Sequence, residues 1–232
     1  ALDERPCNYN FPSMLYKETE LEIVVPEKLG DKKSPADVDM LEEFVLRECR
    51  DADYAVIAMD TLLYGGLIPS RLHNRTREDV RKRLNVLRKV HEDNPKLKIY
   101  AFQCIMRCPR YSSSDEEPDY YGECGTEIHR LGVATHMEKL GLQPEYNKEE
   151  LLEKIPKEDL EDYLARRKFN LEFNLEVLQL AEDGVVDFLI IPQDDSSLYG
   201  FTSMDQIPVR ARISEHGLND VVYLYPGADE IE

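Results

Sequence analysis

The chain has 232 residues, 42% of them hydrophobic and 33% charged, and its formal net charge at pH 7 is −18. This size and composition are typical of one globular domain. The acidic excess argues against a nucleic acid partner, which requires a basic surface, and against docking on an anionic membrane. No apolar run is long enough to span a membrane, and the N-terminus lacks the pattern of a secretory signal.

The five cysteines favour a reducing, cytoplasmic environment, because their number is odd and they are scattered along the chain. Cys104 and Cys108 are close in sequence, but neither a second cysteine pair nor a histidine cluster accompanies them. We therefore expect no bound zinc and no resident cofactor, with a divalent cation as the alternative.

The first predicted elements are a strand and a helix. Residues 21–25 predict a short strand that ends at Pro26. Residues 34–45 predict a helix, because Ser34 is a good N-cap, Pro35 suits the first turn, and apolar residues recur at helical spacing.

The next predicted elements follow the same alternation. Residues 54–59 form a nearly continuous apolar run, which is typical of a strand covered on both faces. A helix is predicted to begin near Thr76, where apolar residues start to recur along one face. Residues 98–102 predict a further strand.

A helical insertion is predicted at about residues 111–184. It begins with an acidic, tyrosine-rich segment and continues with helices over residues 126–140 and 148–183, the second broken near Pro156. After the insertion, the sequence predicts a strand, a helix and a strand, over residues 186–191, 203–215 and 221–225.

Alternation of strands and helices predicts a parallel sheet with right-handed crossovers. We expect residues 1–232 to form a single α/β domain, a parallel-sheet (β/α)-barrel-like fold, with an open doubly wound sheet as the alternative. No helix covers the last predicted strand, and residues 3–8 resemble the end of a preceding strand. We therefore expect the fold to be incomplete and the chain to be a fragment of a longer protein.

The residues that follow the predicted strands are unusually polar, and ligands of α/β sheets bind beyond the carboxyl ends of the strands. Gln103 and the acidic loop 112–117 also follow a strand. Acidic residues and arginines crowded on one rim are costly to hold together without a ligand or a reaction. The candidate substrate-binding residues are Asp3, Glu4, Arg5, Asp60, Tyr64, Arg71, Arg107, Gln193, Tyr199, Tyr225, Asp229 and Glu230.

Asp194 and Asp195 are the candidate catalytic residues. Two neighbouring carboxylates repel each other, so one of them can hold a proton near neutral pH and act as a general acid. The leading hypothesis is a hydrolase acting on a sugar or glycoside, in which Asp195 is the acid and Asp194 polarises or orients the substrate. Because neighbours on a regular strand point in opposite directions, this hypothesis requires the backbone to turn at Gln193 or Asp194.

Two alternatives use the same residues. The first is a metal-dependent enzyme acting on a small polar or phosphorylated substrate, with Asp60, Asp194 and Asp229 as ligands and the arginines as anion clamps. The second is a non-catalytic domain that binds a small ligand. A serine hydrolase is not expected, because the sequence has neither a Ser/His/Asp order nor a nucleophile elbow.

Five long motifs resemble a bacterial family of proteins of unknown function, DUF4127. They are LDERPCN (2–8), DTLLYGGLIPSR (60–71), YSSSDEEPDYY (111–121), PQDDSSLYGF (192–201) and YPGADE (225–230). One departure is Leu198, where the family pattern leads us to expect proline. Members of that family are longer at both ends, so the resemblance also implies that this chain is a fragment. It implies no particular activity.

Overall fold

The computed structural model describes residues 1–194 and 197–228. At its centre is a four-stranded parallel sheet, which confirms the predicted parallel-sheet α/β class. The strands are β1 (Tyr54–Ala58), β2 (Lys98–Phe102), β3 (Phe188–Gln193) and β4 (Val222–Pro226). Each strand pairs with its neighbour in the sequence, in the order β1-β2-β3-β4. This is the strand order of a (β/α) barrel, whereas a doubly wound sheet reverses its order at a switch point.

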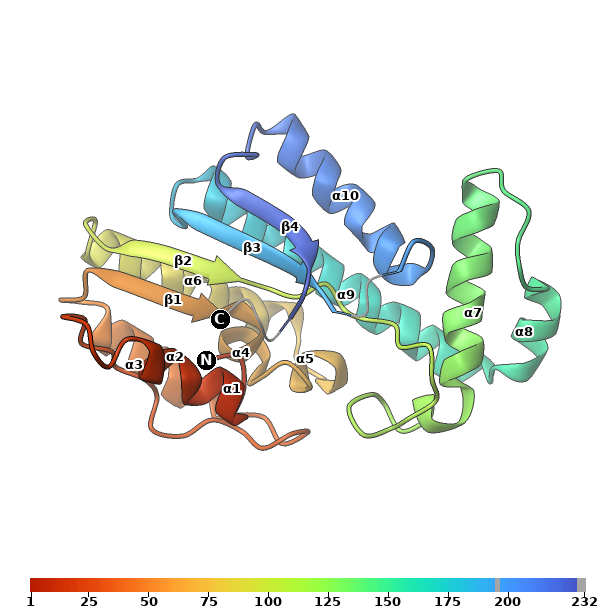
Figure 1. Cartoon of the computed structure of the whole chain (residues 1–232), viewed down its shortest axis with the longest axis horizontal. Helices are drawn as coiled ribbons and strands as arrows, with labels where there is room; N and C mark the ends of the chain where they lie inside the picture. The colour runs from red at the N-terminus through yellow and green to blue at the C-terminus, as the bar shows by residue number, and fades with distance from the viewer. Residues whose placement is uncertain (195–196, 229–232) are drawn as a thin grey trace.

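The helices divide into those that cover the sheet and those beyond it. In Figure 1, α6 and α9 lie behind the sheet, α10 lies alongside β4, and α7 and α8 lie past the carboxyl ends of the strands. No helix in the described ranges is long and apolar enough to cross a membrane. The helices are α1 (Pro6–Tyr9), α2 (Phe11–Leu15), α3 (Val38–Glu48), α4 (Met59–Tyr64), α5 (Pro69–Leu72), α6 (Arg77–Asp93), α7 (Tyr121–Lys139), α8 (Lys148–Lys154), α9 (Lys157–Glu182) and α10 (Phe201–Glu215).

The main core lies between the sheet and these helices. Alternate strand residues such as Ile99 and Leu189 are fully buried against apolar side chains of α6 and α9, among them Leu87 and Val177. Fully burying an aliphatic side chain of this size contributes about 1.5–3 kcal/mol. The second half of α9 is therefore part of the core, while its first half extends toward α7 and α8 (Figure 1).

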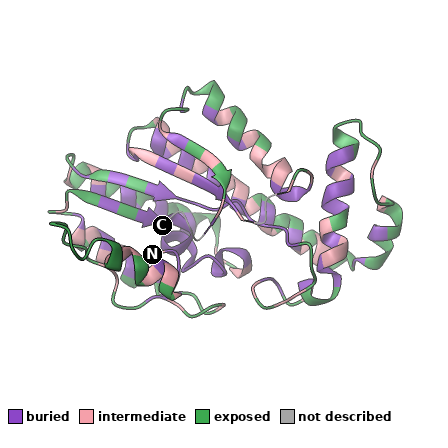
Figure 2. Cartoon of the chain, in the orientation of Figure 1, coloured by how far each residue is buried: buried purple, intermediate pink, exposed green. Residues whose placement is uncertain are grey.

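The opposite side of the sheet is exposed over the first part of the strands, so the prediction that β1 is covered on both faces was wrong there. At the carboxyl ends, Ala58 and Phe102 are buried on that side against Leu2 and Ala228. Tyr54 and Val56 are 59% and 58% exposed, and Figure 2 shows exposed residues along the strands. Tyrosine and phenylalanine rings line this side across all four strands, with centroids 6.3 Å apart for Tyr54–Tyr100 and Tyr100–Phe188, and 5.0 Å apart for Phe188–Tyr223. We call these four residues the aromatic face. Sequential strands joined by crossovers of one hand carry their helices on one side, which leaves this side open.

Two early predictions were also wrong. Residues 21–25 are irregular, and Leu21, Ile23 and Val24 are exposed. Strand propensity depends on a neighbouring strand that can accept the backbone hydrogen bonds, and this segment has no such pairing in the described sheet. The cap of α3 is Asp37 rather than Ser34, since the Asp37 carboxylate accepts from the backbone N–H groups of Asp39 and Met40.

Other local predictions were confirmed. Thr76 caps α6 in a reciprocal capping box with Asp79, which satisfies two backbone donors at the helix start. The helical stretch after residue 148 breaks where predicted, because Pro156 is the N-cap of α9.

Candidate functional site

Five charged side chains meet beyond the carboxyl ends of β1, β2 and β3. Arg71 lies on α5, Arg107 follows β2, Glu116 and Glu117 lie in the loop before α7, and Asp194 follows β3. We call these five residues the charged cluster. The chain turns at Asp194, directly after the last strand residue, Gln193.

Both arginines bind all three carboxylates of the cluster. Arg107 donates from Nε to Glu117 at 2.7 Å, from Nη2 to Glu116 at 2.7 Å and from Nη1 to Asp194 at 3.2 Å. Arg71 donates to Glu117 at 3.1 Å, to Asp194 at 3.4 Å and to Glu116 at 3.5 Å. Burial of the Arg107 guanidinium opposes its charge, but the carboxylates of Glu117, Asp194 and Glu116 outweigh that cost and raise the pKa of Arg107.

Helix α9 holds the backbone that carries both arginines. The Asn170 side chain donates to the carbonyl oxygen of Ser70 at 3.0 Å, next to Arg71. Arg167 donates to the carbonyl oxygen of Arg107 at 2.9 Å. These bonds hold the backbone next to each guanidinium group against α9. The positions of the two arginines therefore depend on the packed core and not only on the loops that carry them.

Asp60 is the buried carboxyl of the site. It lies at the start of α4, directly after β1, and accepts a hydrogen bond from the backbone N–H of Cys104 at 2.9 Å. Burial raises the pKa of Asp60 to about 7, although the Cys104 N–H and the charge of Arg71 oppose the rise. Asp60 can therefore hold a proton near neutral pH, a role that the sequence suggested for one member of the Asp194–Asp195 pair.

Several buried polar atoms at this edge have no hydrogen-bond partner among the described residues. They are Oδ1 of Asp60, both amide atoms of Gln103, Oε2 of Glu117 and Nε2 of Gln193. Gln103 precedes Cys104, which binds Asp60, and Gln193 precedes Asp194, so these atoms belong to the ends of adjacent strands. Because a buried polar atom without a partner costs about 1–3 kcal/mol, this concentration indicates a place where a ligand or water completes the bonding.

Of the predicted site residues, Asp60, Arg71, Arg107, Gln193 and Asp194 lie at this edge. The arginines were expected to bind the substrate, and in the structure they bind carboxylates. The carbonyl of the Gln193 side chain accepts from Gln206 of α10, a contact that the sequence does not reveal. Asp195, Asp229 and Glu230 lie outside the described residues.

Other predicted site residues have different surroundings. Tyr64 is buried and stacks on His73 with ring centroids 4.5 Å apart. Tyr199 packs edge-on against His136 of α7. Tyr225 is exposed on β4, where it pairs with Pro192, one position before the pair Gln193–Pro226.

The three predicted residues near the N-terminus bind one another and a nearby loop. Asp3 accepts from Arg5 at 2.6 Å and from Asn8 at 2.9 Å. Glu4 accepts from the backbone N–H of Lys32 at 2.9 Å. These contacts stabilise the N-terminal segment, and Leu2 beside it reaches the sheet edge, where its carbonyl accepts from Thr61.

Gln103 and the acidic loop with Glu116 and Glu117 were predicted to follow a strand but were not counted among the candidate site residues. Glu116 and Glu117 lie in a serine- and acid-rich loop, and Glu117 is only 1% exposed. The sequence did offer one signal, because Arg107, Arg110 and the acidic loop all follow the strand over residues 98–102. Opposite charges at one edge of a sheet pair readily.

The arrangement bears on the metal alternative. Among residues 1–194 and 197–228, no group of three or more His, Cys, Asp or Glu side chains is placed to hold a metal ion. Arg71 contacts Asp194 and its charge acts on Asp60. A cation between Asp60 and Asp194 would meet the Arg71 guanidinium, and the third predicted ligand, Asp229, lies outside the described residues.

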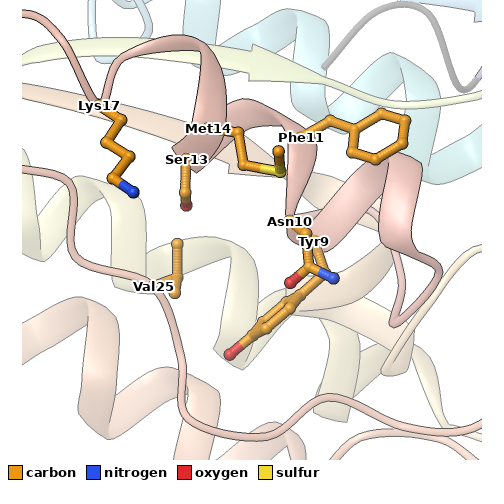
Figure 3. A pocket seen from close by; sticks show the side chains of 7 residues that line it. All are labelled: Tyr9, Asn10, Phe11, Ser13, Met14, Lys17 and Val25. Carbon is orange, nitrogen blue, oxygen red and sulfur yellow. The ribbon is translucent and has the colours of Figure 1, made fainter.

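A separate hollow of about 450 Å³ lies near the N-terminus. Figure 3 shows that it is lined from α1, α2 and the segment after them, by Tyr9, Asn10, Phe11, Ser13, Met14, Lys17 and Val25. Its lining includes no acidic side chain and none of the residues of the charged cluster. The hollow therefore offers no paired acid and base, and the strand-end edge is the better candidate for chemistry.

Comparison with known proteins identifies the chain at the level of a family. Searches of curated proteins and of solved structures gave no match. The family of proteins of unknown function DUF4127 matches residues 1–232, and the chain therefore belongs to that family.

Proposed function

We propose that the protein is a hydrolase that acts on a sugar or glycoside at the carboxyl edge of the sheet. The observation that carries this proposal is the set of buried polar atoms without partners on Asp60, Gln103 and Gln193. A carboxamide both donates and accepts, and so does a sugar hydroxyl, so this set suits hydroxyl groups. Both arginines already bind carboxylates, and this favours a sugar over a phosphorylated substrate that would need the arginines as anion clamps.

Two carboxyls in contrasting environments support acid–base chemistry. Asp60, with its pKa of about 7, carries the proton, and Asp194, bound to two guanidinium groups, carries the negative charge. In the proposed reaction, Asp60 donates its proton to the leaving oxygen and Asp194 activates water or attacks the sugar carbon. Because Asp60 is buried, a substrate reaches it only when the residues that cover it move. Asp195, the acid proposed from the sequence, competes with Asp60 for this role.

The proposal is tested by hydrolysis of a panel of chromogenic glycosides. Asp60→Asn and Asp194→Asn are expected to lower kcat by about 100-fold or more, the usual contribution of a positioned acid or base. Asp51→Asn, which changes an exposed aspartate by the same chemistry, should leave the rate unchanged. If only Asp195→Asn abolishes turnover, the acid is Asp195 and the assignment to Asp60 is wrong.

Two further outcomes decide between the alternatives. Binding of sugars without turnover of any glycoside would indicate a non-catalytic binding domain. Loss of activity in a chelator, with recovery on adding Mg²⁺, would indicate the metal-dependent enzyme. The proposal includes a cytoplasmic location, which is consistent with all five cysteines being free thiols.

The pH dependence of the reaction follows from the pKa of Asp60. If Asp60 must be protonated, kcat should fall as the pH rises through about 7. A rate that stays constant from pH 6 to 9 would contradict a proton donated by Asp60.

A further inference from the structure

Glu116 is the most exposed of the three acidic side chains in the charged cluster. Its side chain is 40% exposed, compared with 25% for Asp194 and 1% for Glu117. In the ion pairs that Glu116 forms with Arg71 and Arg107, only the carboxylate is substantially exposed to water, and water that competes for this charge limits the contribution of such a pair to about a factor of five in an equilibrium. Glu116 is therefore the carboxylate that can leave the arginines at the lowest cost.

The departure of Glu116 would leave a place for another anion. Glu116 is the acceptor 2.7 Å from Nη2 of Arg107, and Arg107 is buried. A buried guanidinium is stable only beside a negative partner. The position that Glu116 fills on the two arginines is shaped for one carboxylate, and it opens when Glu116 leaves.

We infer that the substrate carries a carboxylate, and that this carboxylate replaces Glu116 on Arg107 and Arg71. The inference rests on the function proposed above and narrows its substrate to a sugar acid. A carboxylate keeps the net charge of the cluster unchanged and matches the planar group that it displaces. A phosphate dianion would add a further negative charge beside Glu117 and Asp194, which like-charge repulsion opposes.

The loop that carries Glu116 links binding of the substrate carboxylate to access of the substrate to the buried side chains of the site. Glu116 and Glu117 are neighbours in this loop, which lies between β2 and α7. Displacement of Glu116 frees the exposed part of the loop, while Glu117 stays buried on both arginines. The substrate carboxylate thereby takes the outer position of the cluster and places its sugar hydroxyls toward the buried carboxamides.

Calorimetric titration with D-glucuronate and D-glucose tests this inference. Glu116→Gln removes the competing charge and should tighten glucuronate binding about fivefold, while glucose binding stays the same. Glu116→Ala, which also removes the hydrogen bond, should tighten glucuronate binding at least as much. Glu153→Gln is the matched control, because it makes the same change of charge on exposed α8.

Each other outcome has a distinct meaning. If glucose binds as well as glucuronate and Glu116→Gln changes neither affinity, the sugar-acid inference fails while the proposed function stands. If neither sugar binds to the folded protein, the inference and the proposed function both fail. A weakening of glucuronate binding in Glu116→Gln would mean that Glu116 contacts the ligand rather than competing with it.

Discussion

Asp60 is the proposed acid of the site, and its burial makes the stability of the folded protein depend on pH. The carboxyl has an ordinary pKa of 3.8 in the unfolded chain and a pKa of about 7 in the folded protein. Between these values, the folded protein keeps a proton that the unfolded chain has released. The stability linked to this group is therefore complete below about pH 4 and is lost as the pH rises to about 7.

Replacing Asp60 isolates that effect. Relative to the wild type, Asp60→Asn should gain stability as the pH rises from 4 to 7, by on the order of 4 kcal/mol at most. Urea unfolding at several pH values measures the difference between the two proteins. An unchanged difference across this range would show that the Asp60 pKa is not raised.

Gly65 illustrates a backbone requirement near the site. It ends α4 with φ of 95°, and an added Cβ would lie 2.6 Å from the Cβ of Pro35. Gly65→Ala should therefore destabilise the protein by about 2 kcal/mol or more, through both the left-handed conformation and the clash. Gly141 also has a positive φ but open space around it, so Gly141→Ala should cost only about 1 kcal/mol. Equal losses in urea unfolding would mean that the contact with Pro35 relaxes freely.

At the scale of elements, the two sides of strand β2 differ sharply. Ile99 is fully buried against the helices, while Tyr100 lies on the aromatic face. Ile99→Ala should cost about 2–5 kcal/mol, and Tyr100→Ala about 1 kcal/mol, as measured by thermal or urea unfolding. If Tyr100→Ala is as costly as Ile99→Ala, the aromatic face is covered by a further partner in solution.

Elements with strong local signals could be predicted from the sequence. Thr76 and Asp79 form a capping box within four residues, and the strand over residues 98–102 has a compact apolar pattern. Residues 21–25 have a similar pattern but no strand beside them, so the same local signal led to a wrong prediction. A local pattern shows that a segment favours the strand conformation, but the segment forms a strand only where a neighbouring strand can pair with it.

The candidate site could be predicted only in part. The position of Asp60, Arg71 and Asp194 after parallel strands was enough to place them at one edge. Their partners were not predictable, because Glu117 reaches Arg71 across 46 residues and binds it in place of a substrate. The raised pKa of Asp60 also depends on how deeply the fold buries it, which a single sequence does not specify.

At the scale of the whole molecule, the net charge of −18 dominates the electrostatics. Repulsion among the excess carboxylates opposes the compact state, and dissolved salt screens it. Raising KCl from 20 to 200 mM should therefore raise the Tm, as scanning fluorimetry can measure. A falling Tm would mean that surface ion pairs such as Arg81–Glu176 stabilise the fold more than the repulsion destabilises it.

The path of the chain through the sheet also sets the order in which the protein can assemble. β3 and β4 pair across a connection that holds α10, and β1 and β2 pair across α4, α5 and α6. In contrast, β2 and β3 pair only after the longer segment with α7, α8 and α9 has been spanned. Long loops close slowly, because their ends must give up more conformational freedom before contacts form. Arg71 and Asp194 are 123 residues apart and lie on opposite sides of this connection. Hydrogen exchange during refolding should therefore protect the pairs β3–β4 and β1–β2 before the pair β2–β3, and the charged cluster should be completed among the last contacts of the folding reaction.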